Sequence, residues 1–261
     1  MADEVVQFDV IGPVARLTLN RPQAMNAINL ALLAALDRAL GDIAARDDLR
    51  AVVITGAGPA FCVGADLKEV LAGQNLPAGE LDFLDRAAAV FNALRALSKP
   101  TIAALNGMTM AGGLELAMAC DLIIAAESAQ LADAHANYGV YPGGGGAAVL
   151  PRRIPLNMAM YLLYTGKALT AAEMKAHGLV CEVHPDDKLV DAALALAAKI
   201  AEKSPVALRK MKEVARASAD KTEHDALLHE QVMLREHLRS ADMQEGLRAF
   251  AEKRKPKFAG H

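Results

Sequence analysis

The first half of the chain repeats short apolar runs and helical patterns, and this rhythm limits the possible fold more than any other feature. The alternating run 14–19 follows a Gly-Pro turn and predicts the second strand of a hairpin that begins near Val5. A helix over 30–45, with Asn29 as its cap, leads into an apolar strand over 51–55. The pattern continues with a helix over 83–96, a strand over 101–105, a helix over 114–119 and a strand over 122–125. This alternation predicts an α/β core.

After Pro151 the sequence becomes mainly helical. Only the run 179–183 predicts a further strand. Helices are expected over 157–164, 171–177, 188–203, 206–217, 223–238 and 242–253. No Pro- or Ser-rich linker divides the 261 residues, so we expect one α/β body with a helical appendage.

Composition excludes several classes of function. A hydrophobic content of 53% with 23% charged residues is typical of a folded globular protein and excludes disorder. The 28 Lys and Arg residues against 31 Asp and Glu give a net charge of −3, which is unlike a nucleic-acid binder. The three cysteines, Cys62, Cys120 and Cys181, are far apart, so neither a disulfide framework nor a metal site is expected. A reducing compartment fits this pattern.

The charge of the N-terminal segment and the length of the apolar stretches indicate where the protein is located. The chain opens with acidic residues where a targeting presequence needs basic ones. Its longest apolar stretches are shorter than the roughly 18 residues that a transmembrane helix needs. We therefore expect a cytoplasmic protein that contacts no membrane.

A glycine-rich loop after the 101–105 strand is the strongest candidate for chemistry. Gly112 and Gly113 open a helix, and the first N–H groups of a helix have no partner within it. Such donors can stabilise an oxygen that becomes negative during a reaction. Glu115 follows three residues after Gly112, on the same helix face, which suits acid–base catalysis. The alternative is that Glu115 only stabilises the start of its own helix.

Other candidate motifs give weaker evidence for a function. Gly56-x-Gly58 lacks the third glycine of a dinucleotide fingerprint, and Gly143-x-Gly145 follows a Tyr-Pro pair instead of a strand. His229-Glu230 lacks the second histidine of a zinc protease helix. No G-x-S-x-G elbow is present, which excludes the common serine hydrolases.

Several motifs together resemble the crotonase (enoyl-CoA hydratase/isomerase) superfamily, in order and spacing, from about Leu17 to the C-terminus. They are Phe61 to Lys68, Asn106-Gly107 with Ala111 to Ala117, Cys120-Asp121, Pro142 to Gly146 and Phe250 to Phe258. The resemblance implies an α/β fold built as a spiral of ββα turns. It implies that residues 1–195 form the core with the active site, and that residues 196–261 form a helical trimerisation region. Trimers or pairs of trimers are expected.

The resemblance also implies a binding site for an acyl-CoA thioester. The N–H groups of Ala65 and Gly112 would clamp the thioester carbonyl, and coenzyme A would enter as part of the substrate, with no separate cofactor and no metal. Lys253 and Arg254 match a tail that meets the coenzyme A phosphates in this family, although a charged tail is more often just solvated. The residues that match the family's substrate and coenzyme A contacts are Ala24, Asn26, Ala65, Asp66, Leu67, Lys68 and Gly112.

One position departs from the family pattern. Hydratases of this family use two glutamates; Glu115 matches the first, and His135 stands at the second. If residues 131–135 are extended, Asp133 and His135 face the same way. His135 would then act as general acid or base, with Asp133 orienting it or replacing the missing carboxylate. The alternative is that the two only hydrogen-bond each other or the backbone under the Gly-rich turn.

The leading prediction is an enoyl-CoA hydratase that converts a 2-enoyl-CoA reversibly to a 3-hydroxyacyl-CoA. Because of His135, a crotonase-type isomerase, thioester hydrolase or decarboxylase is the first alternative. A non-catalytic acyl-CoA binder is the second. The acyl specificity is expected to depend on the lining between about Leu71 and Leu84 and on the C-terminal helices. Residues 73–79 are expected to form a mobile loop.

Overall fold

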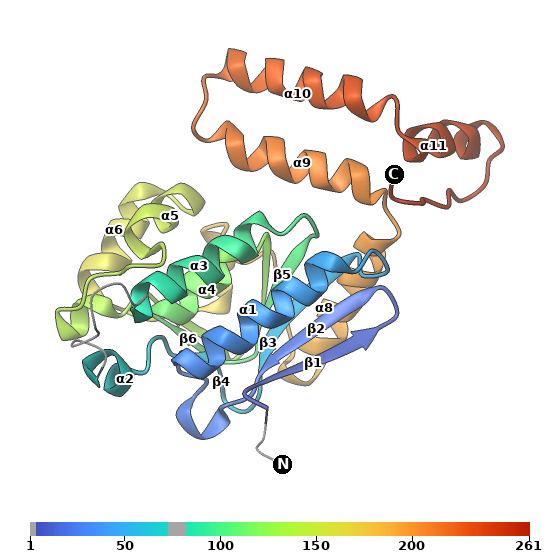
Figure 1. Cartoon of the computed structure of the whole chain (residues 1–261). Helices are drawn as coiled ribbons and strands as arrows, with labels where there is room; N and C mark the ends of the chain where they lie inside the picture. Colours follow the sequence, from blue (N-terminus) through green and yellow to red (C-terminus); the bar gives the residue numbers. More distant parts are fainter. Residues whose placement is uncertain (1–3, 73–81) are drawn as a thin grey trace.

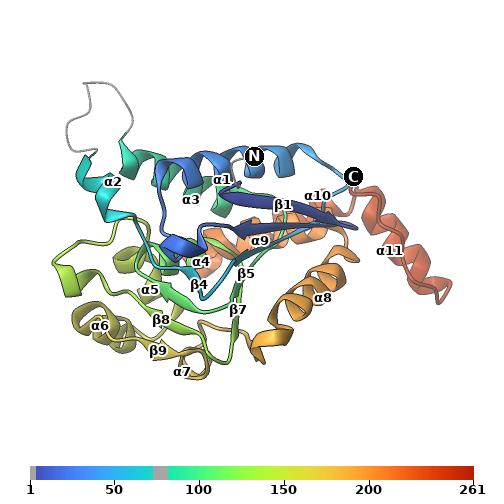
Figure 2. The same ribbon diagram turned by 90° about the horizontal axis from the view of Figure 1, so that it is seen from below.

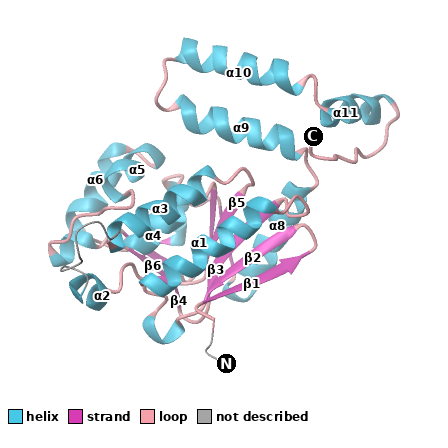
Figure 3. Ribbon diagram, in the orientation of Figure 1, coloured by secondary structure: helices cyan, strands magenta, loops and turns pink. Residues whose placement is uncertain are grey.

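The structure is a computed structural model of the whole chain and describes residues 4–72 and 82–261. The predicted mobile loop at 73–79 lies outside these residues. Two sheets and a set of surrounding helices form the body, and a helical extension projects from it (Figures 1 and 3). No helix in the described part of the chain is both long enough and apolar enough to cross a bilayer.

The larger sheet has six strands in the order β1-β2-β3-β5-β7-β10. The hairpin of β1 and β2 is antiparallel, as the Gly-Pro turn predicts, and the remaining pairs are parallel. Its strands are β1 (Val6–Ile11), β2 (Val14–Leu19), β3 (Ala51–Gly56), β5 (Thr101–Leu105), β7 (Leu122–Ala126) and β10 (Glu182–His184). The strand predicted over 179–183 is therefore displaced, because residues 179–181 precede β10.

A second sheet has four short strands in the order β4-β6-β8-β9, and of these only β8 overlaps a segment expected to be extended, residues 131–135. Its members are β4 (Ala60–Cys62), β6 (Met108–Met110), β8 (Gln130–Ala132) and β9 (Leu169–Thr170). Strands β4, β6 and β8 are parallel neighbours, and each follows closely after a strand of the larger sheet. Each repeat of the chain thus places one strand in the larger sheet and the next in the smaller sheet, with helices between repeats. This arrangement confirms the predicted ββα spiral.

Helices cover both faces of the larger sheet. Helix α8 packs on β2, β3, β5 and β7, while α1 and α3 pack together on the opposite side (Figure 2). The predicted cap of α1 is confirmed, since the Asn29 side chain accepts a hydrogen bond from the Leu32 N–H. The helices of the body are α1 (Leu30–Ala45), α2 (Leu67–Ala72), α3 (Phe83–Ala96), α4 (Gly112–Ala119), α5 (Gly146–Arg153), α6 (Leu156–Thr165), α7 (Ala171–Ala176) and α8 (Leu189–Ala201).

The last three helices form the projecting part of the chain. Helices α9 (Pro205–Ser218) and α10 (Glu223–His237) pack side by side, and α11 (Ala241–Ala251) follows (Figure 1). Asp121, at the end of α4, joins this part to the body: its carboxylate accepts from Lys212 at 2.8 Å and from Arg216 at 2.6 Å. The predicted change from an α/β body to a helical C-terminal region is confirmed.

Candidate active site

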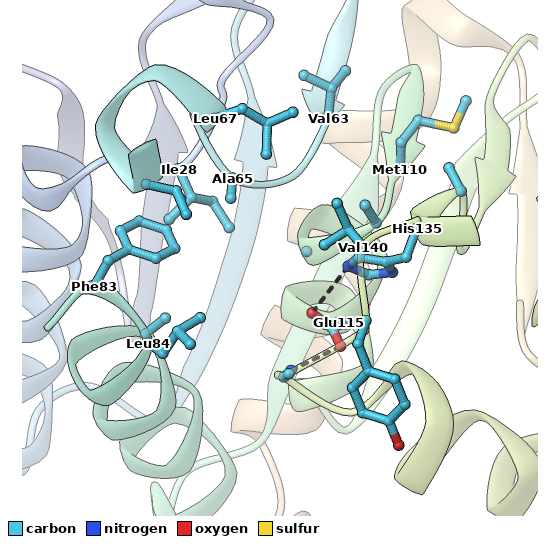
Figure 4. Close-up of a pocket in the computed structure, with 18 of the residues that line it drawn as sticks. Ile28, Val63, Ala65, Leu67, Phe83, Leu84, Met110, Glu115, His135 and Val140 are labelled. Atoms are coloured by element: carbon cyan, nitrogen blue, oxygen red, sulfur yellow. Dashed lines mark hydrogen bonds and ion pairs between the residues drawn. The ribbon is translucent and has the colours of Figure 1, made fainter. Parts of the chain in front are cut away.

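A cavity of about 430 Å³ lies beside the ends of the short parallel strands (Figure 4). The four predicted catalytic residues line it: Ala65, Gly112, Glu115 and His135. They come from three separate segments of the chain, which follow β4, β6 and β8. The carboxyl ends of parallel strands meet at one edge of a sheet, so the short second sheet is what brings these residues together.

The Ala65 N–H points away from Ile28, toward the cavity, because the groups next to it in the chain are hydrogen-bonded to Ile28 on the other side. The Ile28 N–H donates to Gly64 O at 2.7 Å, and the Asp66 N–H donates to Ile28 O at 2.8 Å. In such a parallel bridge the residue between the bonded groups directs its own N–H the opposite way. Within the described residues the Ala65 N–H has no acceptor.

Gly112 supplies a second free N–H at the same place. It is the first residue of α4, so its N–H has no partner within the helix. A methyl group placed on the Gly112 Cα would lie 3.6 Å from the Ala65 nitrogen, and one on Gly64 would lie 3.1 Å from the Gly112 nitrogen. The two backbone nitrogens therefore lie close to each other beside the cavity, and their action as a clamp stays a prediction.

Ala111 adopts a conformation that aims the Gly112 amide. Its φ of 48° and ψ of −122° lie in a region that glycine occupies readily and alanine rarely. The angle ψ of Ala111 sets the plane of the peptide that carries the Gly112 N–H, and the Ala111 N–H is fixed to Ala132 O at 3.0 Å. Strain of this kind costs about 1–3 kcal/mol and gathers at functional sites.

Glu115 is held by the glycine-rich turn. Its Oε1 accepts hydrogen bonds from the Gly144 and Gly146 N–H groups, both at 2.8 Å, and the side chain is buried. Gly146 begins α5, and the N-terminal end of a helix stabilises negative charge. The alternative that Glu115 serves the start of its own helix is wrong, since its carboxylate is bound to another helix. Its Oε2 is left near His135.

His135 does not lie on a strand, so the predicted extended segment over 131–135 is wrong beyond Ala132. Strand β8 ends there, Ala134 is left-handed with φ of 57°, and His135 opens a short 3-10 helix, His135–Tyr138. The turn still brings the predicted pair together, because His135 Nδ1 lies 2.9 Å from Asp133 Oδ1. On its other side, His135 Nε2 lies 3.9 Å from Glu115 Oε2.

The charge state of His135 follows from three competing influences. Burial alone would lower the pKa of the imidazole, but the hydrogen bond and charge of Asp133 and the charge of Glu115 raise it. The net effect is a pKa above the ordinary value of 6.5. The carboxylates on either side therefore favour the protonated ring.

Of the other predicted binding residues, Leu67 lines the cavity, while Ala24, Asp66 and Lys68 are not among its described lining residues. Leu67 is exposed, and Lys68 next to it is exposed as well. The Asp66 carboxylate pairs with Arg21 at 3.2 Å. Ala24 ends a short 3-10 helix, Pro22–Ala24. Their role in coenzyme A binding stays a prediction.

Asn26 differs from these, since it is fully buried. Its side chain accepts from the Arg21 N–H and donates to Ala57 O and Ala60 O. These contacts fix the loop that precedes Ile28. Its described contacts are thus structural, and a direct contact with a ligand stays a prediction.

Cys62 and the charged tail do not enter the cavity. Burial raises the pKa of the Cys62 thiol to about 12, which leaves it protonated and unsuited to act as a nucleophile. Arg254 is bound to Glu245 at 2.6 Å and to Glu252 at 2.6 Å. The phosphate contact of Lys253 and Arg254 stays a prediction.

Most of the cavity wall is apolar and was missed in the sequence. Helix α3 contributes Phe83, Leu84, Ala87 and Phe91 at helical spacing, a pattern that reveals a packed face but not that it faces a cavity. Phe83 and Leu84 lie within the predicted lining. Helices α8 to α11 supply no lining residue among the described residues, and the expected dependence of acyl specificity on the C-terminal helices stays a prediction. The remaining wall includes Ile28, Val63, Val70, Met110, Tyr138, Val140 and Tyr141.

Comparison with known proteins identifies relatives along nearly the whole chain. The family model described as enoyl-CoA hydratase/isomerase matches residues 11–261. A Mycobacterium tuberculosis protein named "Probable enoyl-CoA hydratase echA8" is 39% identical over 245 residues, which cover 94% of each chain. The 2,3-dehydroadipyl-CoA hydratase of Escherichia coli is 37% identical, with 95% of each covered. A crystal structure of enoyl-CoA hydratase from Bacillus anthracis superposes with a TM-score of 0.91 at 37% identity, covering 98% of this chain and 100% of that one.

The glycine-rich turn yields a stability prediction. A methyl group on Gly146 would meet Asp133 Oδ2 at 2.3 Å and Pro142 Cβ at 2.7 Å, so Gly146→Ala should lower the free energy of unfolding by about 1–3 kcal/mol. Gly143→Ala is the matched control, because its nearest neighbour would be Leu84 Cδ2 at 4.0 Å. Urea unfolding of both variants measures the difference. Equal stability of the two would contradict the packing described here.

Proposed function

The chain belongs to the enoyl-CoA hydratase/isomerase family, and from this premise we propose that it catalyses the reversible hydration of a 2-enoyl-CoA to a 3-hydroxyacyl-CoA. The observation that carries the proposal is the pair of free N–H groups of Ala65 and Gly112 at the rim of a cavity that also holds Glu115. Addition of water to the β-carbon moves negative charge onto the thioester oxygen. Preorganised N–H donors are worth about 3 kcal/mol each at such a position.

Glu115 is proposed as the base that activates water. Its Oε1 is fixed by two N–H groups, which leaves Oε2 to take a proton from water as the water oxygen bonds to the β-carbon. The π electrons of the double bond then move to give an enolate, held by the Ala65 and Gly112 N–H groups. His135 Nε2–H delivers a proton to the α-carbon as the enolate returns to the thioester.

After this step Glu115 is protonated and His135 is neutral. Transfer of one proton across the 3.9 Å between Glu115 Oε2 and His135 Nε2 restores the starting state. The reaction therefore consumes only water and the enoyl thioester. In this proposal coenzyme A enters with the substrate, and no metal or separate cofactor takes part.

The apolar wall supports a neutral acyl group as substrate. Among the described lining residues there is no Lys or Arg, and His135 is already flanked by the carboxylates of Asp133 and Glu115. A carboxylate at the end of the acyl chain would therefore find no unpaired cation among them.

We also propose a cytoplasmic location, because Cys62, Cys120 and Cys181 are free thiols, as is usual in reducing compartments. Fractionation of the source cells tests the location.

Double-bond isomerisation is the second candidate, and His135 is the observation that favours it. The Glu115 carboxylate can take a proton from one carbon of an enoyl thioester while the protonated His135 imidazole delivers one to another. Analysis of products separates the candidates: a hydroxyacyl-CoA supports hydration, a shifted double bond supports isomerisation, and free acid or loss of CO₂ supports the hydrolase or decarboxylase predicted as alternatives.

The first functional prediction concerns Glu115. The protein should hydrate crotonyl-CoA, and the loss of absorbance of the conjugated enoyl thioester measures this reaction. It should hydrate more slowly an enoyl-CoA whose acyl chain ends in a carboxylate. Glu115→Gln keeps the shape of the side chain and removes the base, so kcat should fall at least about 100-fold. Binding of coenzyme A thioesters without turnover of any enoyl-CoA would instead identify a non-catalytic binder.

The second concerns the N–H pair. Gly112→Ala adds a methyl group with no neighbour closer than 3.4 Å, so the fold should tolerate it. Because that methyl group lies beside the Ala65 N–H, kcat should fall by about 10² to 10³-fold. The control is Gly41→Ala in α1, where a methyl group meets nothing within 4 Å and activity should be unchanged. Full activity of Gly112→Ala would argue against the proposed clamp.

The third concerns assembly. We propose that residues 196–261 mediate association into trimers, or pairs of trimers, because the described helices α9 to α11 expose apolar side chains. These include Met211, Leu227, Leu228, Val232, Leu234, Leu247 and Phe250, the last 86% exposed. Sedimentation equilibrium should give three or six copies, and Phe250→Glu should weaken the assembly. A monomer at all concentrations would contradict this.

A further inference from the structure

Asp133 is a buried carboxylate with few polar contacts among the described residues. Its side chain is 1% exposed, and its only hydrogen-bond partner among the described residues is His135 Nδ1. Its Oδ2 is buried without any partner in the described part of the chain. Burying a carboxylate is costly unless it is paired. The interaction with His135 must therefore offset that cost.

Two other aspartates show what a structural carboxylate looks like in this protein. Asp242 is also 1% exposed, but its Oδ1 accepts from the Ala259 and Gly260 N–H groups and its Oδ2 accepts from Ser204 Oγ at 2.6 Å. Both oxygens of Asp121 are likewise occupied by Lys212 and Arg216. Asp133 lacks such partners, so its role lies with the imidazole.

The backbone presents Asp133 to His135 at a fixed angle. The β6–β8 ladder pairs Met110 with Ala132, immediately before Asp133. Left-handed Ala134 then turns the chain so that the His135 ring lies against the Asp133 carboxylate. Gly146 closes the other side, because a methyl group there would lie 2.3 Å from Asp133 Oδ2. The ring is thus held by Nδ1, and Nε2 is directed toward Glu115 and the cavity (Figure 4).

We propose that Asp133 is a positioning residue that holds His135 by Nδ1–H and so presents Nε2–H as the proton donor to the substrate α-carbon. The inference rests on the proposed hydration reaction and assigns to an Asp–His pair the task that the resemblance gives to a second glutamate. The groups that face His135 are Asp133 from the end of β8 and Glu115 from α4. Arg95 of α3 lies behind the turn, bonded to Gly144 O.

The pH dependence gives a readout that a purely structural role would not move. The reacting state carries one proton on the His135–Glu115 pair, so kcat/KM should fall as pH rises and that proton is lost. Asp133 raises the pKa of His135 through its hydrogen bond and charge, against the effect of burial. Asp133→Asn keeps the shape and removes the charge. The alkaline limb of the pH profile of kcat/KM, where the rate falls as pH rises, should therefore move to lower pH by about one unit or more.

Asp242→Asn is the matched control, since it makes the same substitution at an equally buried carboxylate outside the cavity. It should leave the alkaline limb in place even if it lowers stability. The limb should also be the same for hydration and dehydration, because the reaction releases no net proton. An unchanged limb in Asp133→Asn overturns the proposal.

A second measurement does not depend on turnover. Nitrogen-15 NMR of histidine-labelled protein, with His135→Gln for assignment, reports the pKa and tautomer of the ring. The expected result is a wild-type His135 that titrates above 6.5 and whose neutral form carries its proton on Nδ1, facing the Asp133 carboxylate. Titration at or below 6.5 overturns the proposal even if Asp133→Asn fails to fold. If the expected titration is found but no enoyl-CoA is hydrated, the proposed function fails while the Asp133–His135 pairing stands. If Asp133→Asn changes the titration of the ring but not the pH profile of the rate, His135 is not the proton donor and the positioning role is overturned.

Discussion

The pairing of three short parallel strands sets the geometry on which the whole site depends. Strand β4 leads to Ala65, β6 leads to Gly112, and β8 leads to Asp133 and His135. Neighbouring strands lie about 4.8 Å apart, so loops that leave the same edge start within reach of one another. One bond fixes the last register, because the Ala111 N–H donates to Ala132 O at 3.0 Å. The strain at Ala111 is tolerated because this ladder and α4 hold the residue from both sides.

The sequence predicts the parts of this arrangement whose signals are long or chemically distinct. The helix over 30–45 and its Asn29 cap are found, as are the buried strands of the larger sheet, because each has a strong apolar period and a clear boundary. The strands of the second sheet are missed because two or three residues carry no usable period. The motifs predict the site residues Ala65, Gly112, Glu115 and His135. The short strands of the second sheet, which carry no such signal, bring these residues together.

The segment around His135 marks the limit of pattern reasoning most clearly. Alternation over 131–135 places Asp133 and His135 on one face, and the two side chains do meet, but for a different reason. A left-handed alanine, which local preference disfavours, turns the chain after Ala132. Long-range contacts lie on either side of it: Asn137 donates to Gly166 O, next to α6, and Gly146 lies against the Asp133 carboxylate. Contacts of this range have no trace in a five-residue window.

Helix α4 connects the chemistry at one end of the molecule's core to the helical extension at the other. Its first residue, Gly112, lines the cavity. Cations donate to the carbonyls at its other end: Arg153 donates to Met118 O and Cys120 O, and Arg216 donates to Ala119 O. Positive groups at the carbonyl end interact favourably with the helix dipole, which is worth up to about 2 kcal/mol in partly buried sites. The free N–H at the other end leaves the positive pole open to a negatively charged oxygen. Arg216 belongs to α9, so docking of the extension and the orientation of the Gly112 N–H bear on the same short helix. The region that sequence analysis separates as an appendage therefore supports the position of α4, although it supplies no side chain to the cavity wall among the described residues.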